Sequence, residues 1–447
     1  MIAEIPASGA DVFHHLVDRG IRRSGRPGSH GQLIIRSKPG PEPQALACAL
    51  RRLGRQAPLL RARWIGDLRG PRWRFAHAAA PLMPELLLEY GTELDQLAAQ
   101  HLRSGLVDGW LIRFGHAPEG IVVTWDHRLI DARGVMGLID HLPRLAAGNR
   151  LDEAWWQPGY RDPPDLPPTH AGRGRLARSL LPLIRHQRLA RIWKPRPALT
   201  SGPTSSGPYV VLDLSLGAKT AVLDARIRAT TGRFGETAFL LAALAGALEA
   251  CGGIAGDLLF PLAVDIRAAG QARLLSNHHG FSMLLVPEGS ATADLGGAAQ
   301  QIKAAQRAWL VGDGVRAMAA SLSYFHYLGA RRGQFEIGNR TSGVWASCLV
   351  ANTGQSRMSE DWFGGAVTAI GHRITVPDQP GLAVIFSRDA RGAGVALIAT
   401  AAVAQALDLS AVLVALRHQL IERELSAVPP VSSSPAASPA GEPLPQA

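Results

Sequence analysis

The sequence VVTWDHRLIDARGVMGLIDHL, residues 122–142, decides the fold and the chemistry that this chain can support. An apolar stretch rich in β-forming residues leads to Trp125, and an apolar stretch with helical spacing follows Asp131. Between them His127 stands four positions before Asp131. This order predicts a buried strand, a tight turn and a helix. An imidazole in that turn suits a general base, because the strand aims the ring and the turn exposes it to a cavity.

The bulk composition predicts a globular protein of two domains. The chain has 447 residues, and 47% of them are hydrophobic, which is ample material for two cores. Its three cysteines, Cys48, Cys251 and Cys348, lie too far apart for a CxxC metal site and suggest no disulfide framework. No apolar run approaches the roughly 20 residues of a membrane span, and the N-terminus lacks a secretory pattern. We therefore expect a cytoplasmic protein, attached at most to a membrane surface.

Most of the formal net charge of +11 comes from one proline-rich segment, residues 166–208. It holds no Asp or Glu, and its eight basic residues are Arg173, Arg175, Arg178, Arg185, Arg188, Arg191, Lys194 and Arg196. One interpretation is a solvated basic linker. The functional alternative is a docking site for an acidic partner, or for an anionic membrane surface through residues 172–196. Nucleic acid is not an expected partner, because no recognition motif accompanies the charge.

The alternation of helical and strand patterns predicts two α/β lobes, residues 1–165 and 209–427, with a disordered tail at 428–447. In the first lobe we expect a helix that contains His14, helices at 44–55 and 133–145, and strands at 59–65, 72–76, 108–114 and 120–125. Pro143 should bend or end the helix expected at 133–145. In the second lobe we expect helices at 216–230, 236–250, 295–310 and 409–425, and strands at 209–214, 258–266, 279–286, 344–351, 365–376, 382–387 and 395–401.

The histidine turn resembles the HxxxD(G) active-site motif of the CoA-dependent acyltransferase superfamily. That superfamily includes chloramphenicol acetyltransferase, nonribosomal peptide condensation domains, wax ester/diacylglycerol acyltransferases and dihydrolipoyl acyltransferases. The wording DHRLID is most similar to the dihydrolipoyl enzymes, but its position in a two-lobed chain resembles the condensation and wax ester types. Two further stretches, residues 259–287 and 347–355, are similar to second-lobe patterns of those types. The resemblance implies an α/β (α+β) fold of two chloramphenicol acetyltransferase-like lobes, each a mixed sheet with flanking helices, pseudo-dimeric in one chain.

The resemblance also implies roles for single residues. His127 would be the general base, and Asp131 would be a structural residue that pairs with an arginine, for which Arg267 is the candidate. Asp126 stands where many relatives carry another histidine. A backbone N–H, or the turn formed by Asn352, Thr353 and Gly354, would stabilise the oxyanion.

Other polar residues attract weaker interpretations. His14 repeats the HxxxD spacing with Asp18, but on a helix such a pair is more often a local contact. The pair His278–His279 is expected to be polar residues at the edge of a strand, with no metal, and Asn277 to be a turn residue.

The implied function is transfer of an acyl group from a thioester to a hydroxyl or amine, in a channel between the lobes. The donor would be acyl-CoA or the phosphopantetheine thioester of an acidic acyl carrier protein, bound as substrate, with no tightly bound cofactor. The alternative is a catalytically degenerate module that binds a carrier protein or a partner enzyme. Ala132 favours this alternative, because relatives have a glycine there, which adopts backbone conformations closed to alanine.

Overall fold

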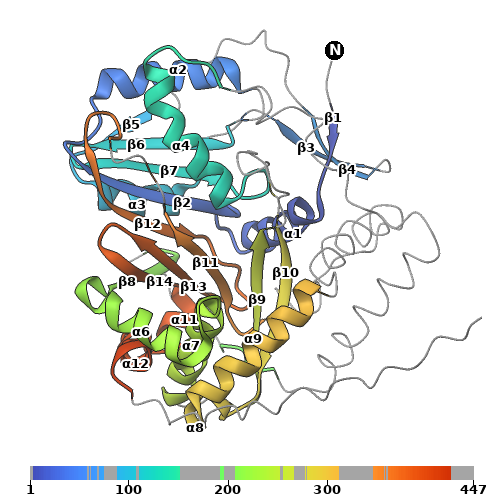
Figure 1. Ribbon diagram of the computed structural model, residues 1–447. Helices are drawn as coiled ribbons and strands as arrows, with labels where there is room; N and C mark the ends of the chain where they lie inside the picture. Colours follow the sequence, from blue (N-terminus) through green and yellow to red (C-terminus); the bar gives the residue numbers. More distant parts are fainter. Residues whose placement is uncertain are drawn as a thin grey trace, which may run out of the picture.

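The computed structural model describes residues 4–57, 60, 62–67, 70–74, 88–106, 110–151, 192–195, 207–251, 255–265, 277, 279–311, 346–356, 358 and 361–423. Two sheets with their own helices form an upper and a lower lobe (Figure 1). Among the described helices, none is both long and apolar enough to cross a bilayer. The three cysteines are free thiols.

The first lobe is built on a five-stranded sheet in the order β12-β2-β7-β6-β5. Helices α2 and α4 pack together on one face of it, and α3 covers the other face. Along β7 the side chains of Ile121 and Val123 enter the core on the α2/α4 face, and Val122 enters the core beside α3. The bounds are β2 (His30–Lys38), α2 (Pro43–Gln56), β5 (Leu88–Tyr90), α3 (Leu94–Ser104), β6 (Ile112–Ala117), β7 (Gly120–Asp126), α4 (Ala132–Ala146) and β12 (Ala366–Ile374).

A small sheet and one helix flank this lobe. The sheet has the order β1-β4-β3, with β1 (Glu4–Pro6), β3 (Arg63–Asp67) and β4 (Gly70–Arg74). Helix α1 (Gly9–Arg23) begins with a capping box, in which Ser8 and Asp11 exchange side chain-to-backbone hydrogen bonds. It reaches the second lobe at β10, so it stands between the two lobes (Figure 1).

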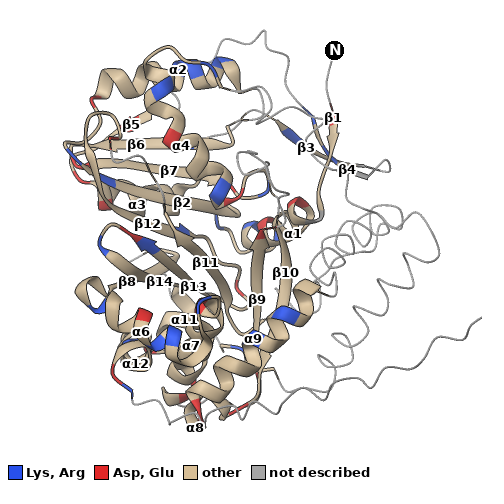
Figure 2. Cartoon of the chain, in the orientation of Figure 1, with Lys and Arg blue, Asp and Glu red and all other residues tan. Residues whose placement is uncertain are grey.

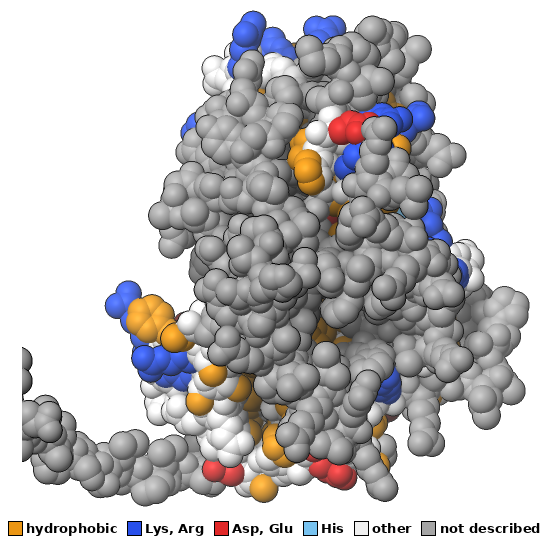
Figure 3. All heavy atoms as spheres, turned by 90° about the vertical axis from the view of Figure 1, so that its right-hand side faces the viewer, with side chains coloured by type: hydrophobic (Ala, Val, Ile, Leu, Met, Phe, Trp, Pro, Cys, Tyr) orange, Lys and Arg blue, Asp and Glu red, His pale blue; other side chains and the backbone are white. Residues whose placement is uncertain are grey.

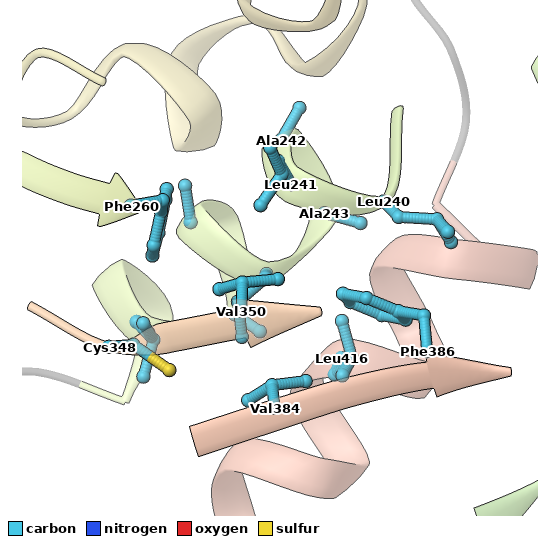
Figure 4. Close-up of a cluster of buried hydrophobic side chains, with 14 of the residues drawn as sticks. Leu240, Leu241, Ala242, Ala243, Phe260, Cys348, Val350, Val384, Phe386 and Leu416 are labelled. Carbon is cyan, nitrogen blue, oxygen red and sulfur yellow. The ribbon is translucent and has the colours of Figure 1, made fainter. Parts of the chain in front are cut away.

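The second lobe has a six-stranded sheet in the order β10-β9-β11-β13-β14-β8. Its core centres on α7, whose residues from Ala238 to Leu248 are all buried, as Figure 4 shows for part of the cluster. A helix that is apolar on every side has to be covered on every side, and α6, α9, α12 and the sheet do this. The bounds are β8 (Tyr209–Ser215), α6 (Thr220–Thr231), α7 (Glu236–Ala250), β9 (Leu258–Asp265), β10 (His279–Val286), α8 (Ser290–Ala293), α9 (Leu295–Val311), β11 (Leu349–Gln355), β13 (Leu382–Asp389), β14 (Gly392–Thr400), α11 (Ala401–Ala406) and α12 (Leu409–Ile421).

The second half of the chain contributes one strand to the first sheet. Strand β12 belongs by sequence to the second half of the chain, yet it pairs antiparallel with β2 at the edge of the first sheet. Trp362, just before β12, is buried in the core of the first lobe. The predicted lobe 209–427 therefore needs a correction, because the segment from Trp362 to Ile374 completes the other lobe.

Pro143 was expected to bend or end α4; it does not end the helix, which continues to Ala146, and the bend stays a prediction. A proline lacks the N–H that would bond the carbonyl four residues earlier, here that of Ile139. The Ile139 carbonyl instead accepts a hydrogen bond from Nε1 of Trp362 at 3.0 Å. The segment that crosses from the second half of the chain thus satisfies the group that Pro143 leaves unpaired.

Charged side chains are spread over both lobes (Figure 2), and on the face in Figure 3 the described Lys and Arg residues form several separate groups. The predicted basic linker lies outside the described residues except for 192–195, and the predicted tail lies wholly outside them. At this short piece the Trp193 N–H donates to the Asp257 carbonyl at 2.9 Å, and Ser347 Oγ donates to the Trp193 carbonyl at 2.6 Å. The piece is thus attached to the second lobe, and docking through residues 172–196 stays a prediction.

The energy of the hydrogen bond between Trp362 and the Ile139 carbonyl can be measured by a double-mutant cycle in urea denaturation. Trp362→Phe should lower the free energy of unfolding by about 1–2 kcal/mol for the lost hydrogen bond, on top of lost packing. In a Pro143→Ala background, residue 143 regains an N–H for the Ile139 carbonyl. There Trp362→Phe should cost about 1 kcal/mol less. Equal costs in both backgrounds would show that the indole does not serve this carbonyl.

Candidate functional site at the lobe junction

The turn after β7 is fixed at both ends. Asp131 is the N-cap of α4, and its Oδ1 accepts a hydrogen bond from the Gly134 N–H at 2.8 Å. Across the turn, Nε1 of Trp125 donates to the Ile130 carbonyl at 2.9 Å. Ala132 is the first residue of the helix, where an ordinary right-handed conformation is needed. Alanine therefore fits this position without strain, because the turn does not need a glycine conformation here.

A buried ion-pair network holds the turn against the first lobe. Arg128 lies between Asp126, at 2.6 Å, and Asp18 of α1, at 3.4 Å. Burial alone would raise the pKa of Asp126, but Arg128 brings it below its ordinary value. Asp18 also accepts a hydrogen bond from the Ser29 N–H at 2.9 Å, and the Ser29 carbonyl accepts one from the His127 N–H. Asp126 thus serves to hold the turn in place, next to the candidate base.

The second lobe supplies a side chain that grips the same turn. Asn277, only 2% exposed, donates from Nδ2 to the carbonyls of His127 at 3.0 Å and Arg128 at 2.8 Å. The same amide contacts Oδ1 of Asp11 in α1 at 3.0 Å. Asn277 was expected to be a turn residue, and the structure makes it a link between the lobes.

Three histidines from three elements meet beside this link. The ring of His14 in α1 stacks on the ring of His127, with centroids 3.9 Å apart and planes inclined by 17°. Nε2 of His14 lies 3.1 Å from Nε2 of His279, the first residue of β10. His14 and His279 are 8% and 7% exposed, and His127 is partly exposed. Within the described part of the chain, no cluster of three or more His, Cys, Asp or Glu has a geometry that would hold a metal ion.

The electrostatics around His14 and His127 favour neutral rings. Burial lowers the pKa of His127 to about 4, and nearby His279 lowers it as well. Its own backbone carbonyl, Asp131 and Asp126 act weakly in the opposite direction. Burial also keeps the pKa of His14 well below its ordinary value, helped by His127 and His279. At neutral pH His127 therefore holds a free lone pair, which a base requires.

The expected arginine partner of Asp131 cannot be placed, because Arg267 lies outside the described residues. Asp131 Oδ2 instead faces Nδ1 of His279 at 3.9 Å. Close by, Arg133 forms an ion pair with Asp265 at the end of β9, across the lobe junction. The Asp131–Arg267 pair stays a prediction.

The predicted turn at Asn352, Thr353 and Gly354 is part of strand β11, with an irregular register after Asn352. The polar groups here are already engaged within the second lobe. Asn352 Nδ2 donates to Thr237 at 3.0 Å, and its Oδ1 accepts the Gly354 N–H at 3.0 Å. An oxyanion role for this segment stays a prediction, and it would require these bonds to break.

A cavity of about 250 Å³ also lies between the lobes, along β12, β8 and β14. None of the three clustered histidines lines it, so the predicted channel to His127 stays a prediction. Its arginines are each matched by a carboxylate, in the pairs Arg36–Asp95, Arg373–Asp213 and Arg391–Asp389.

Sequence reasoning named His127 and Asp131 but missed His14 and His279 as members of the site. A signal for His14 was present, because it shares a helical face with the buried residues Val17 and Ile21, three and seven positions later. His279 shares a strand face with Phe281, whose ring packs on Phe13 of α1 at 4.3 Å between centroids. The contact between these two faces depends on how the lobes dock.

The sequence matches no family model and no curated protein. Solved structures do match, and each comparison covers 94% of this chain. A trichothecene 15-O-acetyltransferase from Fusarium sporotrichioides has a TM-score of 0.67 at 11% identity over 95% of its length. The first condensation domain of the calcium-dependent antibiotic synthetase, with a substrate analogue, has a TM-score of 0.64 at 15% identity over 97%.

The starter condensation domain of rhizomide synthetase, solved with C8-CoA, has a TM-score of 0.60 at 14% identity over 93% of its length. Identities this low establish the fold and leave the reaction open. The predicted fold class is confirmed: the chain has a two-lobed, chloramphenicol acetyltransferase-like fold, which the acetyltransferase and condensation domains above share.

Proposed function

We propose that this protein is an acyltransferase that moves an acyl group from a thioester to a hydroxyl or amine, with His127 as the general base. The observation that carries the proposal is the placement of His127. Its ring lies in a turn gripped by both lobes, through Asn277 and Ser29, in a fold that an acetyltransferase and condensation domains also adopt.

The reaction needs only one proton-accepting group from the protein. The lone pair of His127 takes the proton of the acceptor hydroxyl or amine while its oxygen or nitrogen attacks the thioester carbonyl carbon. The tetrahedral intermediate then collapses, the carbon–sulfur bond breaks, and the thiolate recovers the proton from the imidazolium. The products are an ester or amide and a free thiol, and no covalent acyl-enzyme is formed.

We propose acyl-CoA or an acyl carrier protein as the donor. The rhizomide starter domain, which shares the fold, was solved with C8-CoA. The net charge of +11 suits either donor, since CoA carries phosphates and carrier proteins are acidic. The alternative, a degenerate module that only binds, is less well supported, because Ala132 adopts the helical conformation without strain.

Acyl transfer can be tested by mass spectrometry with a panel of acyl-CoAs and acyl carrier proteins offered to a metabolite extract. We expect a product that depends on the donor, and a loss of at least about 100-fold in its rate of formation in His127→Ala, because the general base is gone. His418→Ala, which alters an exposed histidine on α12, is the matched control and should keep the rate. Transfer that survives His127→Ala unchanged would refute the proposed mechanism.

The low pKa of His127 gives the reaction an unusual pH dependence. Only the neutral ring can accept a proton, so kcat/KM should follow the neutral fraction. With a pKa of about 4, we expect kcat/KM to change less than about two-fold between pH 7.5 and 5.5. A half-maximal rate near pH 6.5 would instead indicate an ordinary solvated imidazole.

This pH range must be checked for folding by circular dichroism. Burial lowers the pKa of His30, His101 and His372 to about 4, so these rings are neutral in the folded protein. The unfolded chain binds more protons below about pH 6.5, and stability therefore falls as the pH drops from 6.5 toward 4. Rates are meaningful only where the spectrum stays native.

A further inference from the structure

Among the residues that the structure describes, no side chain forms a hydrogen bond to Nδ1 of His127, which is buried. In many hydrolases a carboxylate fixes the catalytic imidazole through this nitrogen. Here Asp131, the carboxylate of the same motif, caps α4 with Oδ1 and faces His279 with Oδ2. Besides its own backbone carbonyl, the described groups that can orient the His127 ring are those that pack against it.

The packing partner is His14, and His14 is itself held from the second lobe. The two rings of His14 and His127 are nearly parallel at 3.9 Å. Nε2 of His14 meets Nε2 of His279 at 3.1 Å, a distance that requires one ring to donate and the other to accept. Beyond His279 stands the carboxylate of Asp131.

We propose that His14 and His279 are positioning residues for His127, forming with Asp131 an array that fixes the ring of the base only when the two lobes are docked. This inference rests on the proposed function, since it assigns the groups that make His127 an effective base. It also explains why one histidine of the array comes from α1 and the other from β10.

The charges around the array favour one arrangement of protons. Asp131 faces Nδ1 of His279, so an N–H at that nitrogen is favoured, and Nε2 of His279 becomes the acceptor. His14 then donates from its Nε2. The other charged groups near the turn are already paired, Arg128 with Asp126 and Asp18, and Arg133 with Asp265. Asp11 accepts hydrogen bonds from Asn277 and Trp73.

The stack serves the reaction as well as the ground state. When His127 accepts a proton, its imidazolium lies on the face of a neutral aromatic ring, an arrangement that stabilises a cation. This requires His14 to stay neutral, as its burial and its contact with His279 ensure. A loss of orientation of about 1 Å can reduce a rate by about 100-fold, so the stack can matter strongly.

Kinetics of His14→Ala, His14→Phe and His279→Ala in the full chain test this inference. We expect His14→Ala to lower kcat by about 10-fold to 100-fold with little change in KM. His14→Phe keeps an aromatic face and should lose less than about five-fold. His279→Ala should fall between them, and the double variant His14→Ala/His279→Ala should be no slower than His14→Ala, because both changes disrupt one array.

The pH profile separates positioning from a merely structural role. His14→Ala uncovers the face of the His127 ring that His14 covers, so the acid limb of kcat/KM should move up toward pH 6.5. The matched control is His101→Ala, which removes a fully buried histidine that bonds to Thr124, apart from the array. It should lower the unfolding midpoint but leave kcat and the acid limb in place.

The outcomes separate this inference from the proposed function. If His127→Ala abolishes transfer while His14→Ala and His279→Ala behave like His101→Ala, the array is refuted and the function stands. If His127→Ala keeps the rate, the function itself fails. Urea denaturation gives a readout without activity: the midpoint losses of His14→Ala and His279→Ala should sum to more than that of the double variant. Strict additivity would contradict the contact between the rings.

Discussion

The buried amide of Asn277 is the interaction on which the rest of the site depends. The Nδ2 group of this side chain, which is 2% exposed, donates to the His127 turn and to Asp11 of α1. Asp11 in turn completes the cap of α1 and accepts a hydrogen bond from Trp73. One side chain of the second lobe thereby adds a link between α1 and the turn, beside the Arg128–Asp18 ion pair within the first lobe.

A strand from the second half of the chain also connects the two lobes. Strand β12 closes the edge of the first sheet, and Trp362 reaches the Ile139 carbonyl that Pro143 leaves without an intrahelical partner. A backbone group of α4 is thus satisfied from the other half of the chain. Asp131 is the N-cap of α4, so the helix that follows the histidine turn is held by residues from both halves of the chain.

The sequence predicted much of the fold because most elements carry strong local patterns. The bounds of α7 and β10 agree with the expectation, and the strand–turn–helix around His127 is confirmed. Strand β2 and helix α3 were not anticipated, although LIIRS at 33–37 had a strand-like pattern. The continuation of α4 past Pro143 and the pairing of β12 with β2 could not be predicted. Both depend on contacts between residues more than 200 positions apart.

In the candidate site, too, residues of a local motif were predicted and residues brought in by long-range contacts were not. His127 and Asp131 lie in one local motif and were identified from spacing, whereas His14 and His279 reach the site through α1 and β10 and were given other interpretations. The central claim is that docking of the lobes encloses a neutral His127. Its most direct test is an NMR titration of selectively labelled histidine rings in the intact protein, with His127→Gln to assign the signal. We predict a midpoint near pH 4 for His127. A midpoint near 6.5, the value of a solvated imidazole, would contradict the account.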